Sequence, residues 1–201
     1  MIDLMKRAVV IPVLTIERVE DAAPLARALV DGGLEVLEVT LRTPAALDAI
    51  RAIVAEVPEA VVGSGTALTP ADVEASARAG AAFAVSPGLT PSLLRADAIP
   101  LLPGVATASE LMLGLEAGLQ AFKFFPAVQA GGAAMLKAWA GPFASARFCP
   151  TGGIDLSNAG SFLDLPNVLC VGGGWVAPRS MIERGDWTGI TALALQARGL
   201  K

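Results

Sequence analysis

The chain has 201 residues, with 15 basic and 19 acidic side chains and a net charge of -4 at neutral pH. Hydrophobic residues make up 54% of the sequence and charged residues 17%, which is typical of a globular protein and excludes a disordered one. No block of like charge occurs, so the sequence argues against nucleic acid or an anionic membrane surface as the main partner. We expect a single compact domain over residues 1–201.

The cysteines and the first residues indicate the compartment. Cys149 and Cys170 lie in apolar runs without a paired spacing, which favours buried thiols in a reducing compartment over a disulfide. The first apolar run is short and is broken by Pro12, so it predicts neither a signal segment nor a membrane span. We therefore expect a cytoplasmic protein.

Short β-rich runs alternate with helical stretches along the whole chain. The predicted strands cover residues 8–15, 35–42, 60–68, 81–89, 99–105, 121–127, 146–154 and 168–176. Apolar runs joined by helices are typical of parallel strands that are buried on both faces. Because eight such units occur, the sequence favours a closed (β/α)8 TIM barrel over an open doubly wound α/β sheet.

Start and stop signals mark the helices between these strands. A threonine that could cap a helix precedes a first-turn proline at Thr43-Pro44, Thr69-Pro70 and Thr90-Pro91. Glycines are expected to end three helices, at Gly32-Gly33, Gly80 and Gly118. The fourth crossover is the shortest, at little more than two turns, and residues 187–200 predict the closing helix.

Residue parity assigns side chains to the barrel interior or to the helix layer. In the strand at 35–42 one alternating row is apolar and should face the helices, which leaves Glu38, Thr40 and Arg42 pointing into the barrel. The same rule turns Lys123 inward in the strand at 121–127. A carboxylate, a guanidinium and an amine should therefore meet at the carboxyl end of the barrel, where barrel enzymes assemble their sites.

Parity also turns Ser64 and Thr66 toward the interior, either as core hydroxyls or as substrate donors. The spacing leaves both interpretations open.

The chemistry available to these groups is narrow, because the chain contains no histidine and therefore lacks the commonest metal ligand and general base. A lysine can add to a carbonyl carbon as an imine while a nearby carboxylate moves protons. Burial among Phe122, Phe124 and Phe125 favours the neutral amine, as does the charge of Arg42. Glu38 favours the ammonium form, and the sequence leaves the balance open. The competing interpretation is a buried ion pair of Lys123 and Glu38 that serves folding alone.

Glycine clusters end the last two predicted strands, in PTGGI at 150–154 and VGGGW at 171–175. The loops after these two strands frequently hold phosphate in barrel enzymes, because glycine lets backbone N–H groups close on an anion. The alternative is that these glycines only make tight turns.

Long motifs occur in one order along nearly the whole chain: VLEVTLRTP, GSGTALTP, SPGLTP, LPGVATASELMLGLEAG, FKFFPA, GPF, RFCPTGGI and VLCVGG. They resemble the 2-keto-3-deoxy-6-phosphogluconate aldolase family of imine-forming lyases, which also includes 4-hydroxy-2-oxoglutarate aldolases. The resemblance implies a class I aldolase that yields pyruvate and glyceraldehyde 3-phosphate and works in the Entner–Doudoroff pathway. It implies a homotrimer, and we expect neither a metal nor an organic cofactor.

The resemblance also implies roles for residues. Lys123 would form the Schiff base and Glu38 would be the general acid and base. The carboxylate of pyruvate would be bound by Arg42 and Thr66. The pocket would be lined by Phe125 and Pro87, and the far end of the substrate with its phosphate would be held by Thr151, Gly152, Gly153, Gly173 and Gly174.

One departure concerns the phosphate. Relatives commonly carry serine where this chain has Gly174, so a hydroxyl donor is missing and backbone donors remain. The preference for a phosphorylated substrate is accordingly expected to be weakened.

Three other functions compete with this hypothesis. The first is an aldolase for 4-hydroxy-2-oxoglutarate or a related 2-keto-3-deoxy sugar acid. The second is a phosphate-sugar isomerase or epimerase in which Glu38 moves protons and Lys123 only stabilises charge. The third is a barrel that binds an anionic metabolite without catalysis.

Overall fold

A computed structural model describes residues 1–200. Parallel strands occupy the eight predicted positions: β1 (Val10–Leu14), β2 (Val36–Thr40), β3 (Val61–Gly65), β4 (Phe83–Val85), β5 (Leu101–Leu102) with β6 (Gly104–Val105), β7 (Ala121–Phe124), β8 (Arg147–Pro150) and β9 (Val171–Gly173). The observed strands are shorter than the predicted ones. The predicted strand at 99–105 is divided, since Pro103 has no N–H group to donate to the ladder.

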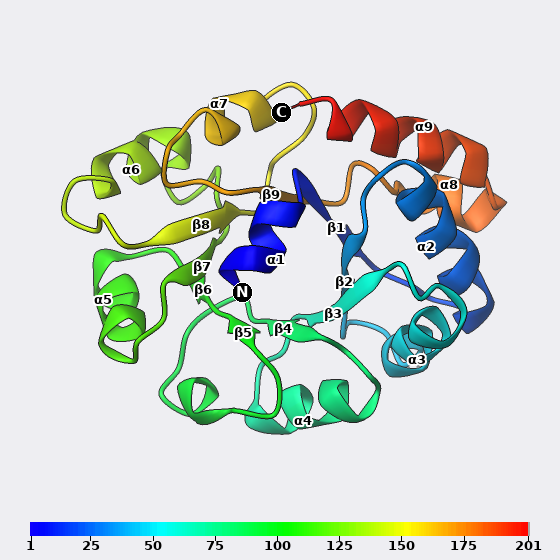
Figure 1. Cartoon of the computed structure of the whole chain (residues 1–201), viewed down its shortest axis with the longest axis horizontal. Helices are drawn as coiled ribbons and strands as arrows, with labels where there is room; N and C mark the ends of the chain where they lie inside the picture. Colours follow the sequence, from blue (N-terminus) through cyan, green and yellow to red (C-terminus); the bar gives the residue numbers. More distant parts are fainter. Residues whose placement is uncertain (201) are drawn as a thin grey trace.

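The strands close into a ring that helices surround (Figure 1). Six segments pair in the order β5-β4-β3-β2-β1-β9 and three in the order β6-β7-β8. The two sheets are continuous through β5 and β6 on either side of Pro103, and they meet again where single bridges join Phe148 to Val168 and Thr151 to Gly172. The predicted (β/α)8 barrel is therefore confirmed.

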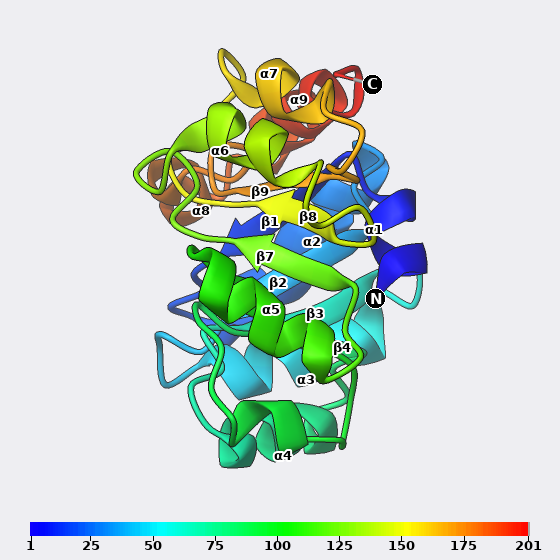
Figure 2. The ribbon, with the colours of Figure 1, turned by 90° about the vertical axis from the view of Figure 1, so that its left-hand side faces the viewer.

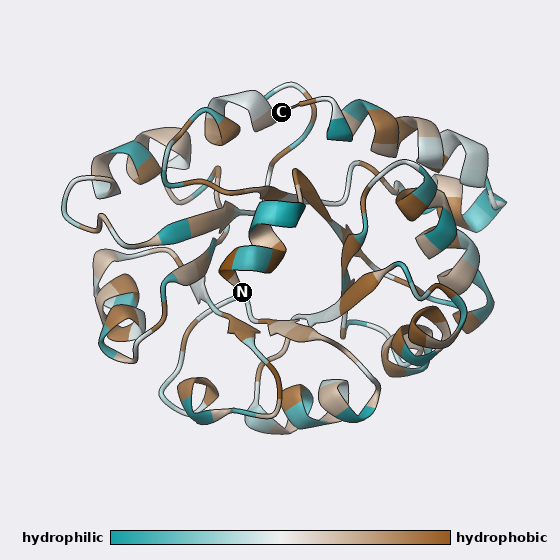
Figure 3. Cartoon of the chain, viewed as in Figure 1, coloured by the Kyte–Doolittle hydropathy of each residue, from teal (hydrophilic) through white to brown (hydrophobic). Residues whose placement is uncertain are grey.

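The helices are α1 (Ile2–Arg7), α2 (Ala22–Asp31), α3 (Ala46–Glu56), α4 (Pro70–Arg78), α5 (Ala108–Glu116), α6 (Gly132–Trp139), α7 (Ala159–Leu163), α8 (Arg179–Arg184) and α9 (Trp187–Arg198). Two 3-10 turns, Val19–Asp21 and Leu93–Arg95, complete the set for residues 1–200. Figure 3 shows most strand segments as hydrophobic, with polar residues concentrated on the helices. The apolar strand faces that point outward pack on these helices as one large core.

Of the three predicted caps, only one starts a regular helix as expected. Thr69 accepts a hydrogen bond from the N–H of Asp72 and completes a capping box at α4. The prediction for Thr43 is wrong, because its hydroxyl donates to the carbonyl of Ile16 at 2.6 Å and α3 begins later, at Ala46. Thr90 accepts from the N–H of Leu93, but the segment that follows is a single 3-10 turn and not two turns of helix.

The helix ends agree better with the sequence. Gly33, Gly80 and Gly118 follow α2, α4 and α5 with positive φ, a conformation that costs glycine little. The predicted closing helix is α9. Within residues 1–200, the longest and most apolar helices fall short of what a membrane span requires.

The sequence did not predict α1, which crosses the middle of the ring (Figure 1). Figure 2 places α1 at the end of the barrel from which the arrowheads of the strands point away. Met5 is fully buried there in a second core with the inward-facing side chains of several strands, Ile11 and Phe83 among them. The thiols of Cys149 and Cys170 are buried in the same core, as predicted. The amino end of the barrel is thus filled, and the open end is the carboxyl end.

Candidate active site

Lys123 and Glu38 meet inside the barrel. The Nζ atom of Lys123 lies 3.1 Å from Oε1 and 3.4 Å from Oε2 of Glu38, and the two side chains are only 6% and 4% exposed. The backbones of β2 and β7 hold these residues from strands that are 85 positions apart in the sequence. Gly65 of β3 makes the room, because a Cβ atom at that position would overlap the Glu38 carboxylate.

The alternation of β2 and β7 follows the predicted parity. Leu37 and Val39 belong to the outer core beneath the helices, opposite Glu38. Phe122 and Phe124 belong to that core as well, so the inference that they surround the amine is wrong. Only Phe125 lies beside the amine, with its ring centroid 5.3 Å from Nζ of Lys123. The apolar surroundings of Lys123 are therefore weaker, and the partnership with Glu38 matters more.

The prediction for Ser64 is wrong, because the parity of β3 is the reverse of that expected. Gly63 and Gly65 face the interior, where added Cβ atoms would overlap Phe83 and Glu38. Val62 of the same strand lies in the outer core, and Ser64 is fully buried on that side with no hydrogen bond to its Oγ. Thr40 does point inward, but its hydroxyl donates to the carbonyl of Leu14 and so joins β2 to β1.

Thr66 follows the end of β3 and has an unusual backbone conformation. Its φ is 60°, in the left-handed region that β-branched residues avoid. This conformation brings its hydroxyl to Arg42, whose Nε donates to Thr66 Oγ1 at 3.1 Å. The two residues predicted to bind one carboxylate are thus in contact at the exposed mouth of the barrel.

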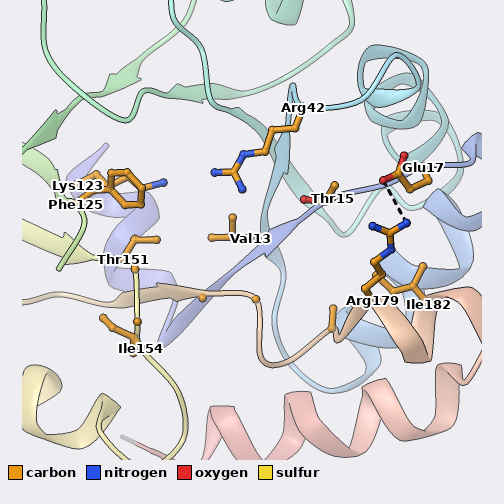
Figure 4. Close-up of a pocket in the computed structure, with 15 residues that line it drawn as sticks. Val13, Thr15, Glu17, Arg42, Lys123, Phe125, Thr151, Ile154, Arg179 and Ile182 are labelled. Carbon is orange, nitrogen blue, oxygen red and sulfur yellow. Dashed lines mark ion pairs between the residues drawn. The ribbon is translucent and has the colours of Figure 1, made fainter. Parts of the chain in front are cut away.

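A cavity of about 360 Å³ opens at this end (Figure 4). Of the predicted site residues, those that line it are Lys123, Arg42, Phe125, Thr151, Gly152, Gly153, Gly173 and Gly174. Glu38 is not among the lining residues and lies against the lining amine of Lys123. Thr66 reaches the site through its contact with Arg42, whereas Pro87 does not line the cavity.

The two glycine clusters both line the cavity, and a bridge between Thr151 and Gly172 joins the strands that carry them. Gly152 and Gly153 have φ values of 104° and 73°, so they need the conformational freedom of glycine. A Cβ atom at Gly173 would overlap the ring of Trp175, whereas the corresponding space at Gly174 is open, with only the carbonyl oxygen of Val13 nearby at 3.4 Å. All four glycines line the cavity where the sequence predicted an anion.

Several lining residues were absent from the predictions. Val13 pairs with Glu38 across β1 and β2, and Thr15 follows with the same parity, so the alternation of the first strand could have identified both. Glu17, Arg179 and Ile182 also line the cavity, but they lie in loops or in α8 beyond the strands. The alternation of side chains along strands cannot predict where residues in loops or helices point.

Nothing among residues 1–200 gathers three or more side chains of the types that ligate metals into one group. The site combines an amine that a carboxylate contacts, a guanidinium at the mouth and two clusters of lining glycines. On a barrel, this combination defines an enzyme that acts on the carbonyl of an anionic substrate through a lysine.

Comparisons with known proteins give the family. The family model described as KDPG and KHG aldolase matches residues 1–193. The KHG/KDPG aldolase of Escherichia coli strain K12 is 55% identical over 191 residues, which cover 94% of this chain and 90% of that protein. The 2-dehydro-3-deoxy-phosphogluconate aldolase of Dickeya dadantii is 54% identical over the same shares of the two chains. The chain belongs to the KDPG and KHG aldolase family, as its motifs predicted, and it is a lyase.

Solved structures agree with this assignment. KDPG aldolase from Legionella pneumophila, with pyruvate captured as a covalent carbinolamine intermediate, superposes with a TM-score of 0.95 at 49% identity and 96% coverage of both chains. The enzyme of Zymomonas mobilis with 3-phosphoglycerate gives a TM-score of 0.94 at 52% identity, covering 100% of this chain and 96% of that one. The isomerase and the noncatalytic alternatives are accordingly wrong.

Proposed function

We propose that this protein reversibly cleaves 2-keto-3-deoxy-6-phosphogluconate into pyruvate and glyceraldehyde 3-phosphate through a Schiff base on Lys123. The observation that carries the proposal is the 3.1 Å contact between the Lys123 amine and Glu38 beside a cavity of about 360 Å³. Family membership and the carbinolamine of the Legionella pneumophila relative support the same chemistry.

Glu38 first makes Lys123 reactive. The ammonium nitrogen lies within hydrogen-bond distance of both carboxylate oxygens, so transfer of one proton to Glu38 yields the neutral amine. The amine adds to the C2 carbonyl and forms a carbinolamine. Protonation of the carbinolamine hydroxyl by Glu38 releases water and leaves a protonated imine and a carboxylate.

The same carboxylate then removes the proton of the C4 hydroxyl. The C3–C4 bond breaks, its electron pair moves into the imine as an enamine, and C4 becomes the aldehyde of the departing product. Return of a proton to C3 and hydrolysis of the imine release pyruvate and the free lysine. Atoms and charge balance without an added metal or organic cofactor.

The remaining residues hold the substrate. Arg42 and Thr66, in contact at 3.1 Å, would bind the carboxylate of the keto acid, and Phe125, which lines the cavity, would pack beside it. Thr151 with Gly152 and Gly153 would bind the middle and far parts of the substrate, and Gly173 with Gly174 would bind the phosphate through backbone N–H groups. Confinement at both ends orients C2 toward the amine.

Reductive trapping tests the proposal. Borohydride added in the presence of pyruvate should attach a stable three-carbon adduct to the peptide that contains Lys123, as measured by mass spectrometry. Lys123→Arg keeps the charge but cannot form the imine, so it should lose both the adduct and aldol cleavage. An unmodified Lys123 in active wild-type protein would exclude the mechanism.

A second substrate, 4-hydroxy-2-oxoglutarate, is favoured by two observations: the cavity has Gly174 where the family commonly presents a hydroxyl, and the Escherichia coli relative carries both names. Gly174→Ser restores the hydroxyl into open space. We expect it to lower KM for the phosphorylated substrate about threefold to tenfold and to leave 4-hydroxy-2-oxoglutarate unchanged, as measured by steady-state kinetics. Equal changes in KM for both substrates would show that the phosphate does not bind at position 174.

We further propose that the protein works as a cytoplasmic homotrimer in the Entner–Doudoroff pathway. Exposed apolar side chains in loops at the carboxyl end, Leu68, Val128 and Leu156, support association of copies. Light scattering of the purified protein should give a mass three times that of the 20.4 kDa chain.

A further inference from the structure

The far end of the cavity holds a charged pair that the proposed mechanism does not use. Figure 4 shows Lys123 at one end of the cavity and Arg179 with Glu17 at the other. Arg179 is the first residue of α8, and both Arg179 and Glu17 line the cavity together with the glycine clusters. The site proposed above therefore contains a third cation besides Lys123 and Arg42 among its lining residues.

The contacts of Arg179 leave part of its guanidinium available. Its Nε donates to Glu183 at 2.7 Å, which anchors one edge of the group. Its Nη2 is 3.9 Å from Glu17 Oε1, which is close enough for an ion pair but too long for a hydrogen bond. The side chain is 75% exposed, and a second cavity of about 270 Å³ adjoins it on the side of Arg18 and Asp21. The terminal N–H groups of Arg179 are therefore available to donate hydrogen bonds, and the side chain has room to move.

Arg179 supplies a positive charge at the end of the cavity opposite Lys123. The four lining glycines have no side chains, so they supply neither a cation nor a hydroxyl. Arg42 is engaged with Thr66, and Lys123 lies at the opposite end with Glu38. A phosphate monoester carries up to two negative charges and is bound most strongly where an arginine supplies paired N–H donors.

We propose that Arg179 is a specificity-determining residue that binds the phosphate of the substrate, and that Glu17 competes with that phosphate for Arg179. The inference rests on the proposed aldolase function and assigns the recognition of the phosphate to a side chain. When substrate binds, the guanidinium exchanges its 3.9 Å contact with Glu17 for direct contact with phosphate oxygens and keeps its hydrogen bond to Glu183.

Glu17 has a definite effect in this arrangement. Its carboxylate lines the same cavity, where it repels an incoming phosphate unless Arg179 neutralises it. The nearby carboxylates of Glu183 and Glu17 raise the pKa of Arg179, so the guanidinium stays charged at any pH at which the enzyme works. The preference for phosphate is therefore set by the balance between one cation and one competing anion.

Steady-state kinetics of Arg179→Ala, Glu17→Gln and the double variant test the proposal. Each is assayed with the phosphorylated keto acid and with the same keto acid lacking the phosphate. Arg179→Ala should lower kcat/KM for the phosphorylated substrate about tenfold, and Glu17→Gln should raise it about twofold to threefold. The double variant should lie between Arg179→Ala and wild type, because the repulsion by Glu17 is gone. The substrate without phosphate should change less than about twofold.

Arg184→Ala is the matched control. It removes the same charge from the same helix, it is exposed, and it does not line the cavity. It should behave as wild type with both substrates. The proposal is overturned if Arg179→Ala keeps the wild-type preference for phosphate, or if it lowers kcat/KM equally for both substrates.

A binding measurement separates this inference from the proposed function. Calorimetry with 3-phosphoglycerate and with glycerate should show that wild type prefers the phosphorylated ligand and that Arg179→Ala loses about tenfold of that preference. Wild type that traps pyruvate on Lys123 but shows the same preference with and without Arg179 overturns only this inference. Wild type that binds phosphate through Arg179 but neither traps pyruvate nor cleaves the substrate overturns only the proposed aldolase function.

Discussion

At the scale of single residues, Lys123 and Glu38 each compensate a charge that would be costly alone. Their side chains are 6% and 4% exposed, and removing one partner of such a pair leaves the other buried without compensation. Because Lys123 also lines the cavity, we expect the pair to contribute both to folding and to reactivity. Its two contributions can be separated by substitution.

Lys123→Met should lower the free energy of unfolding by about 3 kcal/mol, because Glu38 remains buried without its cation. Adding Glu38→Gln should recover at least half of that loss. Both variants should lose at least about 10⁴-fold in kcat, since neither can form an imine. Urea denaturation and a coupled pyruvate assay measure the two effects. A Lys123→Met protein as stable as wild type would mean that the pair contributes nothing to folding.

Thr66 gives a second prediction at this scale, because its positive φ strains a β-branched residue. Thr66→Ala and Thr66→Gly remove the same hydrogen bond to Arg42, but only glycine relieves the strain. Thr66→Gly should therefore be about 1 kcal/mol more stable than Thr66→Ala, while both raise KM to a similar extent. Equal stabilities in thermal unfolding would show that the backbone at this position carries no strain.

At the scale of elements, the sequence signals worked where a short motif contains its own hydrogen-bonding partners. The predicted cap Thr69 forms a capping box with Asp72 at α4, and Thr107, which was not among the predicted caps, forms another with Glu110 at α5. Thr43 failed as a cap because the carbonyl of Ile16, distant in sequence, took its hydroxyl. Local motifs are readable from sequence only when no tertiary partner competes for the same group.

The capping box of α5 predicts a dependence of stability on pH. Partial burial alone would raise the pKa of Glu110, but hydrogen bonds from the backbone of Ala106 and from Thr107 outweigh it and hold the pKa below its usual value. The stabilisation is complete above the pKa of the unfolded chain, about 4.3, and is lost as pH falls through the lower folded value.

Glu110→Ala should therefore cost about 1 kcal/mol at pH 7, and the difference from wild type should shrink as the pH is lowered below about 4. Glu116→Ala, in the last turn of the same helix, is the control and should show no such dependence. Chemical denaturation across this pH range measures both. A constant difference at every pH would contradict the assignment of the shift to the capping box.

At the scale of the whole molecule, α1 fills the amino end of the barrel and leaves the carboxyl end for the cavity. Met5 is fully buried among inward-facing strand residues, so Met5→Ala should lower the free energy of unfolding by about 2–4 kcal/mol. Met112→Ala, at a side chain that is 51% exposed, should change stability by less than about 0.5 kcal/mol. If both cost the same in thermal unfolding, α1 is not part of the core.

The family, the barrel and the inward direction of Glu38 and Lys123 were determined by the sequence alone, because period-2 alternation and ordered motifs are local properties of the chain. Only the tertiary structure decided that the parity of β3 is reversed and that Arg179 lines the cavity beside Glu17. Those facts depend on how strands tilt and register against one another and on where loops return, and these are set by packing between segments far apart in sequence.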